Sequence, residues 1–198
     1  MVGLARFRKV LSFYLANPIV KVLAKTPVTP NFLTFLSFIL AAGAGALIAT
    51  ANILAAGFVF LVAGLLDILD GALARQTKRV TNFGAVLDST LDRLSEGVVL
   101  LGILFLYTDK GSTSGILLTG AVMLTSLLVS YIKARAEAAN IECAVGIFTR
   151  PERIIVLVLG LLINQLEIAL AVIVAFSLFT AGQRLIHVWR QTKKNSGG

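Results

Sequence analysis

The sequence predicts an all-α membrane protein with six transmembrane helices and an N-terminal amphipathic helix in the membrane interface. Hydrophobic residues make up 57% of the 198 residues, whereas charged residues make up only 14%. The mean hydropathy of +0.89 is far above that of a soluble domain. Long apolar stretches recur along the chain, and short polar segments rich in Lys and Arg separate them.

The N-terminal residues 1–25 mix basic groups with apolar side chains at helical spacing, interrupted at Asn17-Pro18. This pattern favours a segment that lies in the membrane interface, and a disordered basic arm is the alternative. We expect residues 26–190 to form one transmembrane domain that carries the function. We expect residues 191–198 to form a disordered tail.

Six apolar stretches are predicted to span the bilayer. They cover residues of about 32–50, 54–73, 83–106, 115–134, 154–162 and 166–188. The first contains small residues at 41–46, which suit close helix packing. The second and third contain acidic residues, and the fourth ends in basic ones. The fifth is short and is expected to begin earlier, at Pro151.

Loop charges predict the orientation. Lys and Arg are frequent before the first span, after the second, after the fourth and after the sixth, whereas the opposite turns contain only Lys110. By the positive-inside rule, both termini of this multi-pass protein face the cytoplasm, in the cell membrane. The net charge of +8 then reflects cytoplasmic loops facing anionic lipids rather than nucleic acid binding.

Four aspartates lie in otherwise apolar sequence. Asp67 and Asp70 are three residues apart, and Asp88 and Asp92 are four apart, so each pair shares one face of a helix. An Asp at the centre of a transmembrane helix costs about 2.5 to 3.5 kcal/mol, which a bound cation, a paired charge or a water-filled cavity offsets. Carboxylates with room for substrate phosphates suit Mg²⁺ or Mn²⁺. A polar packing motif and a proton or cation path, as in a transporter, are the alternatives.

The spacing of these residues matches a known signature. The pattern D-x2-D-G-x2-A-R-x8-G-x3-D-x3-D, running from Asp67 to Asp92, resembles the CDP-alcohol phosphotransferase family at every position. The resemblance implies transfer of the phosphatidyl group of CDP-diacylglycerol to an alcohol, with release of CMP. It implies two divalent ions held by Asp67, Asp70, Asp88 and Asp92, and it implies a homodimer. Asp92 is the candidate general base, although it could instead complete the metal shell.

The same resemblance implies a nucleotide site. Arg75 is expected to hold a phosphate of the CDP group, because a guanidinium forks onto phosphate oxygens. The expected lining is Asn31, Thr34, Asp70, Gly71, Ala74, Arg75 and Gly84. For Asn31 and Thr34, helix capping is an equally good explanation.

The acceptor alcohol is predicted from cations near the cytoplasmic face. The stretches 130–137 and 150–153 resemble the branch of the family that makes phosphatidylinositol phosphate, with inositol 1-phosphate as acceptor. The residues expected to bind the acceptor's phosphate are Ser130, Lys133, Arg153 and Arg184. Ordinary positive-inside charge is the interpretation for Arg135, Arg150, Arg190, Lys193 and Lys194.

Two questions stay open. Glu96 either pairs with Arg93 or shapes the acceptor cavity. The acceptor could also be glycerol 3-phosphate, whose phosphate suits the same cations. A cation transporter, the alternative of a different class, requires a polar path to the outer face, and the outer halves of the spans are almost wholly apolar.

Overall fold

A computed structural model describes residues 18–195 of the chain, and this part is helical, with no strand. Residues 18–23 are helical, and residues 1–17 of the predicted amphipathic segment lie outside the described residues. The long helices are α2 (Pro30–Ala49), α3 (Ile53–Gln76), α4 (Asn82–Asp109), α5 (Thr113–Ala138), α6 (Arg150–Leu162) and α7 (Leu166–Asn195). Each apolar stretch predicted from the sequence therefore corresponds to one helix.

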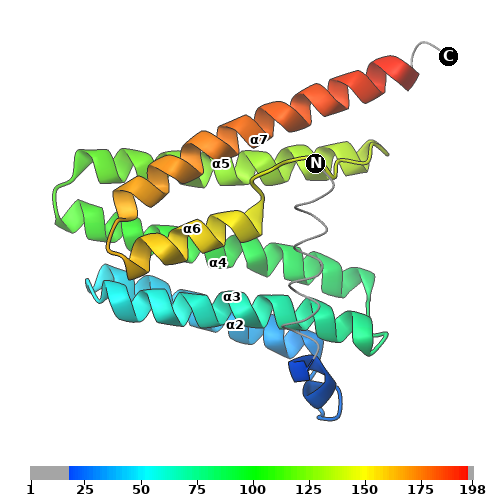
Figure 1. The fold of residues 1–198 in the computed structure, drawn as a ribbon, viewed down its shortest axis with the longest axis horizontal. Coiled ribbons are helices and arrows are strands. Elements are labelled where there is room, and N and C mark those ends of the chain that lie inside the picture. The colour runs from blue at the N-terminus through cyan, green and yellow to red at the C-terminus, as the bar shows by residue number, and fades with distance from the viewer. Residues whose placement is uncertain (1–17, 196–198) are drawn as a thin grey trace.

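The helices form a bundle whose members run along one long axis (Figure 1). The turns alternate between the two ends, so that the start of α2 and the end of α7 lie at the same end. Helix α7 continues to Asn195, beyond the predicted domain end at residue 190. It continues because residues 191–195 contain Gln and Lys, which favour helix, and no Gly or Pro.

Four helices are long and apolar enough to cross a membrane: α2, α3, α5 and α7. Helix α4 has the length, at 28 residues, but its first half carries charged side chains. Helix α6 has 13 residues and is therefore about 20 Å long, shorter than the hydrocarbon core of about 30 Å. The structure confirms an all-helical membrane fold within the described residues, and the count of six spans remains a prediction.

Small residues let α2 pack closely against α4. A Cβ on Gly45 would lie 2.6 Å from the carbonyl oxygen of Val98, and Gly102 faces the Gly45 backbone. Ser37 Oγ on α2 also donates a hydrogen bond of 2.8 Å to the carbonyl oxygen of Ala63 on α3. These contacts hold together the three helices that carry the aspartates and the predicted nucleotide site.

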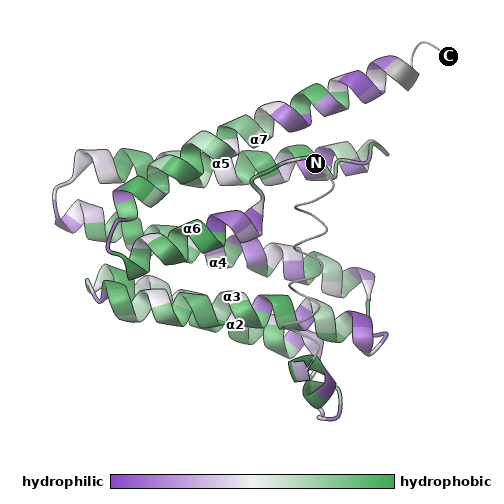
Figure 2. Cartoon of the chain, in the orientation of Figure 1, coloured by the Kyte–Doolittle hydropathy of each residue, from purple (hydrophilic) through white to green (hydrophobic). Residues whose placement is uncertain are grey.

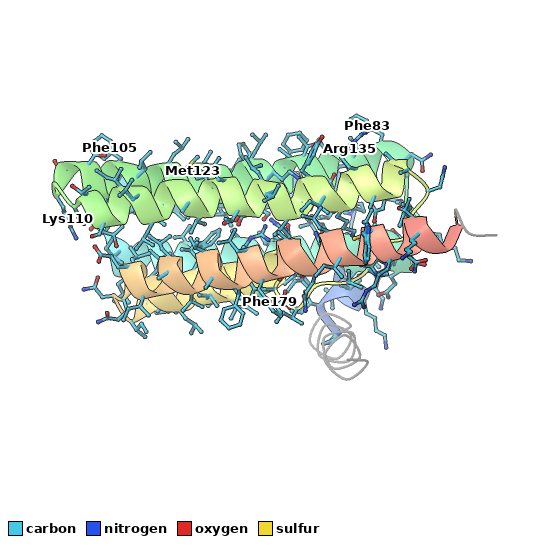
Figure 3. The ribbon with its side chains drawn as sticks, turned by 90° about the horizontal axis from the view of Figure 1, so that it is seen from above. Phe83, Phe105, Lys110, Met123, Arg135 and Phe179 are labelled. Carbon is cyan, nitrogen blue, oxygen red and sulfur yellow. The ribbon has the colours of Figure 1, made fainter. Side chains whose placement is uncertain are left out.

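The surface of the bundle is apolar, as expected for side chains that face lipid. Phe83, Phe105 and Phe179 point outward (Figure 3) and are exposed. Polar residues gather at one end, at the start of α6, at the α3–α4 turn and along the last turns of α7 (Figure 2). Lys110 lies at the opposite end from Arg135 (Figure 3). This polar end contains the candidate site.

Candidate active site

The carboxylates of Asp67, Asp70 and Asp88 form one cluster. Each offers an oxygen, and these oxygens all lie within 4.8 Å of one another. Asp70 is only 3% exposed, and its Oδ2 is buried without a hydrogen-bond partner. A buried carboxylate oxygen with no donor fits a cation, since leaving it unsatisfied is costly. The all-oxygen donor set suits Mg²⁺ or Mn²⁺.

The α3–α4 turn brings the two aspartate pairs together. Lys78, with a φ of 53°, adopts the left-handed conformation after α3 ends. Thr81 then caps α4, and its Oγ1 accepts a hydrogen bond of 2.9 Å from the backbone N–H of Gly84. The chain therefore reverses within a few residues, and the last turns of α3 lie beside the first turns of α4.

One cavity of about 310 Å³ lies between α2, α3 and α4 at this end. Its lining includes all seven residues predicted to bind the nucleotide: Asn31, Thr34, Asp70, Gly71, Ala74, Arg75 and Gly84. At Gly84 the cap of α4 leaves little room for a side chain, since a Cβ there would lie 2.9 Å from Thr81 Oγ1. Arg79, which the sequence analysis did not select, also lines this cavity and adds a second cation.

The capping interpretation of Asn31 and Thr34 is wrong. The N-cap of α2 is Thr29, whose Oγ1 accepts a hydrogen bond of 3.3 Å from the backbone N–H of Phe32. Thr34 donates instead to the carbonyl oxygen of Pro30, at 3.1 Å. Neither side chain is needed to start the helix, and both line the cavity.

A second cavity of about 260 Å³ lies between α4, α5, α6 and α7. It contains the four residues predicted to bind the acceptor's phosphate: Ser130, Lys133, Arg153 and Arg184. Arg184 is 5% exposed, and its Nε donates to the carbonyl oxygen of Val145 at 3.0 Å while its Nη1 donates to that of Val129. Lys133 is exposed, with its Nζ 3.6 Å from Glu137 Oε1.

Glu96 pairs with Arg153, which resolves the question that the sequence left open. The two side chains form parallel hydrogen bonds, from Nε at 2.7 Å and from Nη2 at 2.8 Å, and both residues are buried. Arg93 is exposed and donates to the carbonyl oxygen of Ser89 instead. The pair joins α4 to the first turn of α6 and also lines the second cavity.

Arg150 is not the ordinary surface charge that the sequence analysis predicted. Its Nη1 lies 2.7 Å from Asp67 Oδ2 and 2.7 Å from Asp92 Oδ1, with the side chain 18% exposed. A capping box between Thr149 and Glu152 starts α6 at this point and so aims its first turn at the aspartates. The sequence carried no local signal for this contact, because 83 residues separate Arg150 from Asp67.

A third cavity, of about 370 Å³, is an apolar groove between α3 and α6. Its lining is Leu61, Gly64, Leu65, Asp67, Ile68, Pro151, Ile154, Ile155, Val158, Leu159 and Leu162. Asp67 is its one charged residue. No local pattern in the sequence predicts this groove, because it forms only where the two helices meet.

Comparison with known proteins agrees with the geometry. A family model described as CDP-alcohol phosphatidyltransferase matches residues 27–183. The archaetidylinositol phosphate synthase of Methanothermobacter thermautotrophicus is 43% identical over 170 residues, which cover 82% of this chain and 84% of the relative. The phosphatidylinositol phosphate synthase of Mycobacteroides abscessus is 34% identical over 180 residues, 86% of this chain and 82% of the relative.

Solved structures of the Mycobacterium tuberculosis phosphatidylinositol phosphate synthase share the fold. The structure with CDP-DAG bound has a TM-score of 0.80 and 32% identity, and the match covers 89% of this chain and 94% of that one. The complex with manganese and citrate has a TM-score of 0.77 and 33% identity, covering 87% and 88% respectively.

Proposed function

The chain belongs to the CDP-alcohol phosphatidyltransferase family, and we propose that it transfers the phosphatidyl group of CDP-diacylglycerol to inositol 1-phosphate, giving phosphatidylinositol phosphate and CMP. The relatives that make inositol phosphate lipids, at 34% and 43% identity, support this choice of acceptor.

One observation carries the proposal: three cavities of different chemistry meet at the four aspartates. Asp70 and Asp88 belong to the cavity that contains the predicted nucleotide residues. Asp92 belongs to the cationic cavity. Asp67 belongs to the apolar groove. A nucleotide, a phosphorylated polyol and an acyl chain are the three parts that this reaction must bring to one phosphorus atom.

We assign the divalent-ion site to Asp67, Asp70 and Asp88, with Asp92 beside it and two ions in all. Bound divalent ions would neutralise the pyrophosphate and stabilise the leaving oxygen. Arg75, which lies over Gly71 in the first cavity, would hold a phosphate of the CDP group. The apolar groove would receive an acyl chain of the lipid, since its lining buries hydrocarbon at the depth of the aspartates.

Asp92 is proposed as the general base. It lies in the acceptor cavity, within reach of a polyol hydroxyl bound there. As that oxygen forms a bond to the lipid-bearing phosphorus, its proton passes to the Asp92 carboxylate. The phosphoanhydride bond breaks at the same phosphorus, and its electron pair leaves on the phosphate of CMP. Ser130, Lys133, Arg153 and Arg184 would hold the acceptor's own phosphate.

The proposed membrane arrangement follows from the same assignment. Six helices cross the bilayer, and both termini face the cytoplasm. The site then opens to the cytoplasm, where water-soluble acceptors are available, and beside the inner leaflet that supplies the lipid. In this proposal, two copies of the chain form a homodimer.

A comparison of acceptors, each supplied alone, tests the function. Purified protein receives CDP-diacylglycerol, Mg²⁺ or Mn²⁺, and one of three acceptors, namely inositol 1-phosphate, inositol or glycerol 3-phosphate. We expect CMP release with inositol 1-phosphate and little with the others, and the Asp88→Asn protein serves as an inactive control. Turnover with glycerol 3-phosphate alone would overturn the inositol assignment. CMP release that persists in Asp88→Asn would overturn the metal assignment.

A further inference from the structure

Arg150 belongs to two sites at once. Its Nη1 contacts the carboxylates of Asp67 and Asp92, each at 2.7 Å. The same side chain lines the cavity assigned to the phosphorylated acceptor. Its Nε is buried and has no hydrogen-bond partner. A buried guanidinium N–H without an acceptor is costly, so this side chain has donor capacity that a ligand in the cavity can use.

The other buried cations of this cavity are already held in place. Arg153 forms two hydrogen bonds with Glu96, and Arg184 donates to two backbone carbonyl oxygens. Their positions do not depend on the aspartate cluster. Arg150 differs, because one of its partners, Asp67, belongs to that cluster and the other, Asp92, is the proposed general base.

A divalent cation at the cluster and the Arg150 guanidinium require the same carboxylate charge. Asp67 offers an oxygen to the group of three, and its Oδ2 accepts the hydrogen bond from Arg150. A cation that is coordinated by Asp67 therefore weakens the ion pair between Asp67 and Arg150. An anion that draws Arg150 into the acceptor cavity leaves Asp67 and Asp92 more negative, which strengthens cation binding.

We propose that Arg150 couples the two sites: it competes with the divalent cation for Asp67 and Asp92, and it moves to the acceptor's phosphate when that cation binds. The inference rests on the proposed function, since it takes the second cavity to be the acceptor site. Cation and phosphorylated acceptor then bind with positive cooperativity, and neither site reaches full affinity alone.

Titration of Mn²⁺ into the purified protein, followed by electron paramagnetic resonance or calorimetry, tests this coupling without turnover. In the wild-type protein, saturating inositol 1-phosphate should lower the Kd for Mn²⁺ by about 5-fold or more, within the usual range of coupling between sites. By reciprocity, saturating Mn²⁺ should lower the Kd for inositol 1-phosphate by the same factor.

The Arg150→Ala protein should change the two affinities in opposite directions. Mn²⁺ binds several-fold more tightly without acceptor, because its competitor is gone, while inositol 1-phosphate binds more weakly. The acceptor no longer shifts the Kd for Mn²⁺. A residue that only supports the fold would weaken both ligands. Arg150→Lys, which keeps the charge, should restore part of the coupling, and it replaces Arg150→Ala if that protein does not fold.

Arg135→Ala is the matched control, since it removes one exposed cation from the same end of the bundle. It should leave both affinities and their coupling unchanged. Weaker Mn²⁺ binding in Arg150→Ala, or wild-type Kd values that are independent of the other ligand, would overturn the coupling role. Repeating the titrations with glycerol 3-phosphate and inorganic phosphate separates the two proposals: coupling with glycerol 3-phosphate alone supports Arg150 and rejects inositol.

Discussion

Removal of Glu96 should cost far more stability than removal of an exposed acidic residue. Glu96 is 7% exposed and Arg153 is 2% exposed, and two hydrogen bonds of 2.7 and 2.8 Å join them. Truncation of Glu96 leaves the Arg153 charge buried and unpaired, which costs about 3 to 5 kcal/mol. We therefore expect Glu96→Ala to lower the free energy of unfolding by about that amount.

Glu137→Ala provides the matched comparison. Glu137 also pairs with a cation, Lys133, but at 3.6 Å and with side chains that are 54% and 49% exposed. An exposed pair four residues apart on a helix contributes only about 0.3 to 0.5 kcal/mol. The two variants thus remove the same functional group from a buried pair and from a solvent-screened pair.

Reversible unfolding by SDS in mixed micelles measures both free energies. A double-mutant cycle with Arg153→Ala isolates the pair, and the double variant should be less destabilised than the sum of the single variants, because neither charge is then left alone. If Glu96→Ala and Glu137→Ala cost the same, or if the single costs simply add, the Glu96–Arg153 pair does not hold α6 against α4.

Three further predictions concern the site. Asp92→Asn should still bind CDP-diacylglycerol but lose turnover, measured as CMP release, because the amide cannot take the hydroxyl proton; full turnover would remove the base assignment. Lys133→Ala should raise the KM for inositol 1-phosphate more than that for CDP-diacylglycerol, and an equal rise would count against a phosphate site at Lys133. Gly84→Leu should raise the KM for CDP-diacylglycerol at least about tenfold, since Gly84 lines the nucleotide cavity and a leucine side chain would occupy part of it, and an unchanged KM would place the nucleotide elsewhere.

The sequence and the structure agree best where the pattern is local. Asp67 and Asp70 share a helix face because of their spacing, and so do Asp88 and Asp92. The short turn between α3 and α4 places the end of α3 beside the start of α4, so the two pairs lie close together. For the same reason, the predicted nucleotide residues, which lie on α2 and on both sides of this turn, line a single cavity.

Agreement was weaker where a contact joins distant segments. Arg150 was assigned to ordinary surface charge, yet it bridges two of the aspartates. Glu96 had an apparent partner three residues away in Arg93, but the buried Arg153 is closer in space. The nearest opposite charge in sequence was not the nearest one in the fold.

The sequence by itself determined the membrane class of this protein, the helices and the acidic signature, because hydropathy and helical periodicity act within one segment. Only the tertiary structure decided which cations meet which acids. That outcome depends on how α6 packs against α3 and α7 at the end of a long loop, which brings its first turn to the acids of α3 and α4. A buried charge must find its partner across the bundle, since the low-dielectric interior leaves no solvent to replace it.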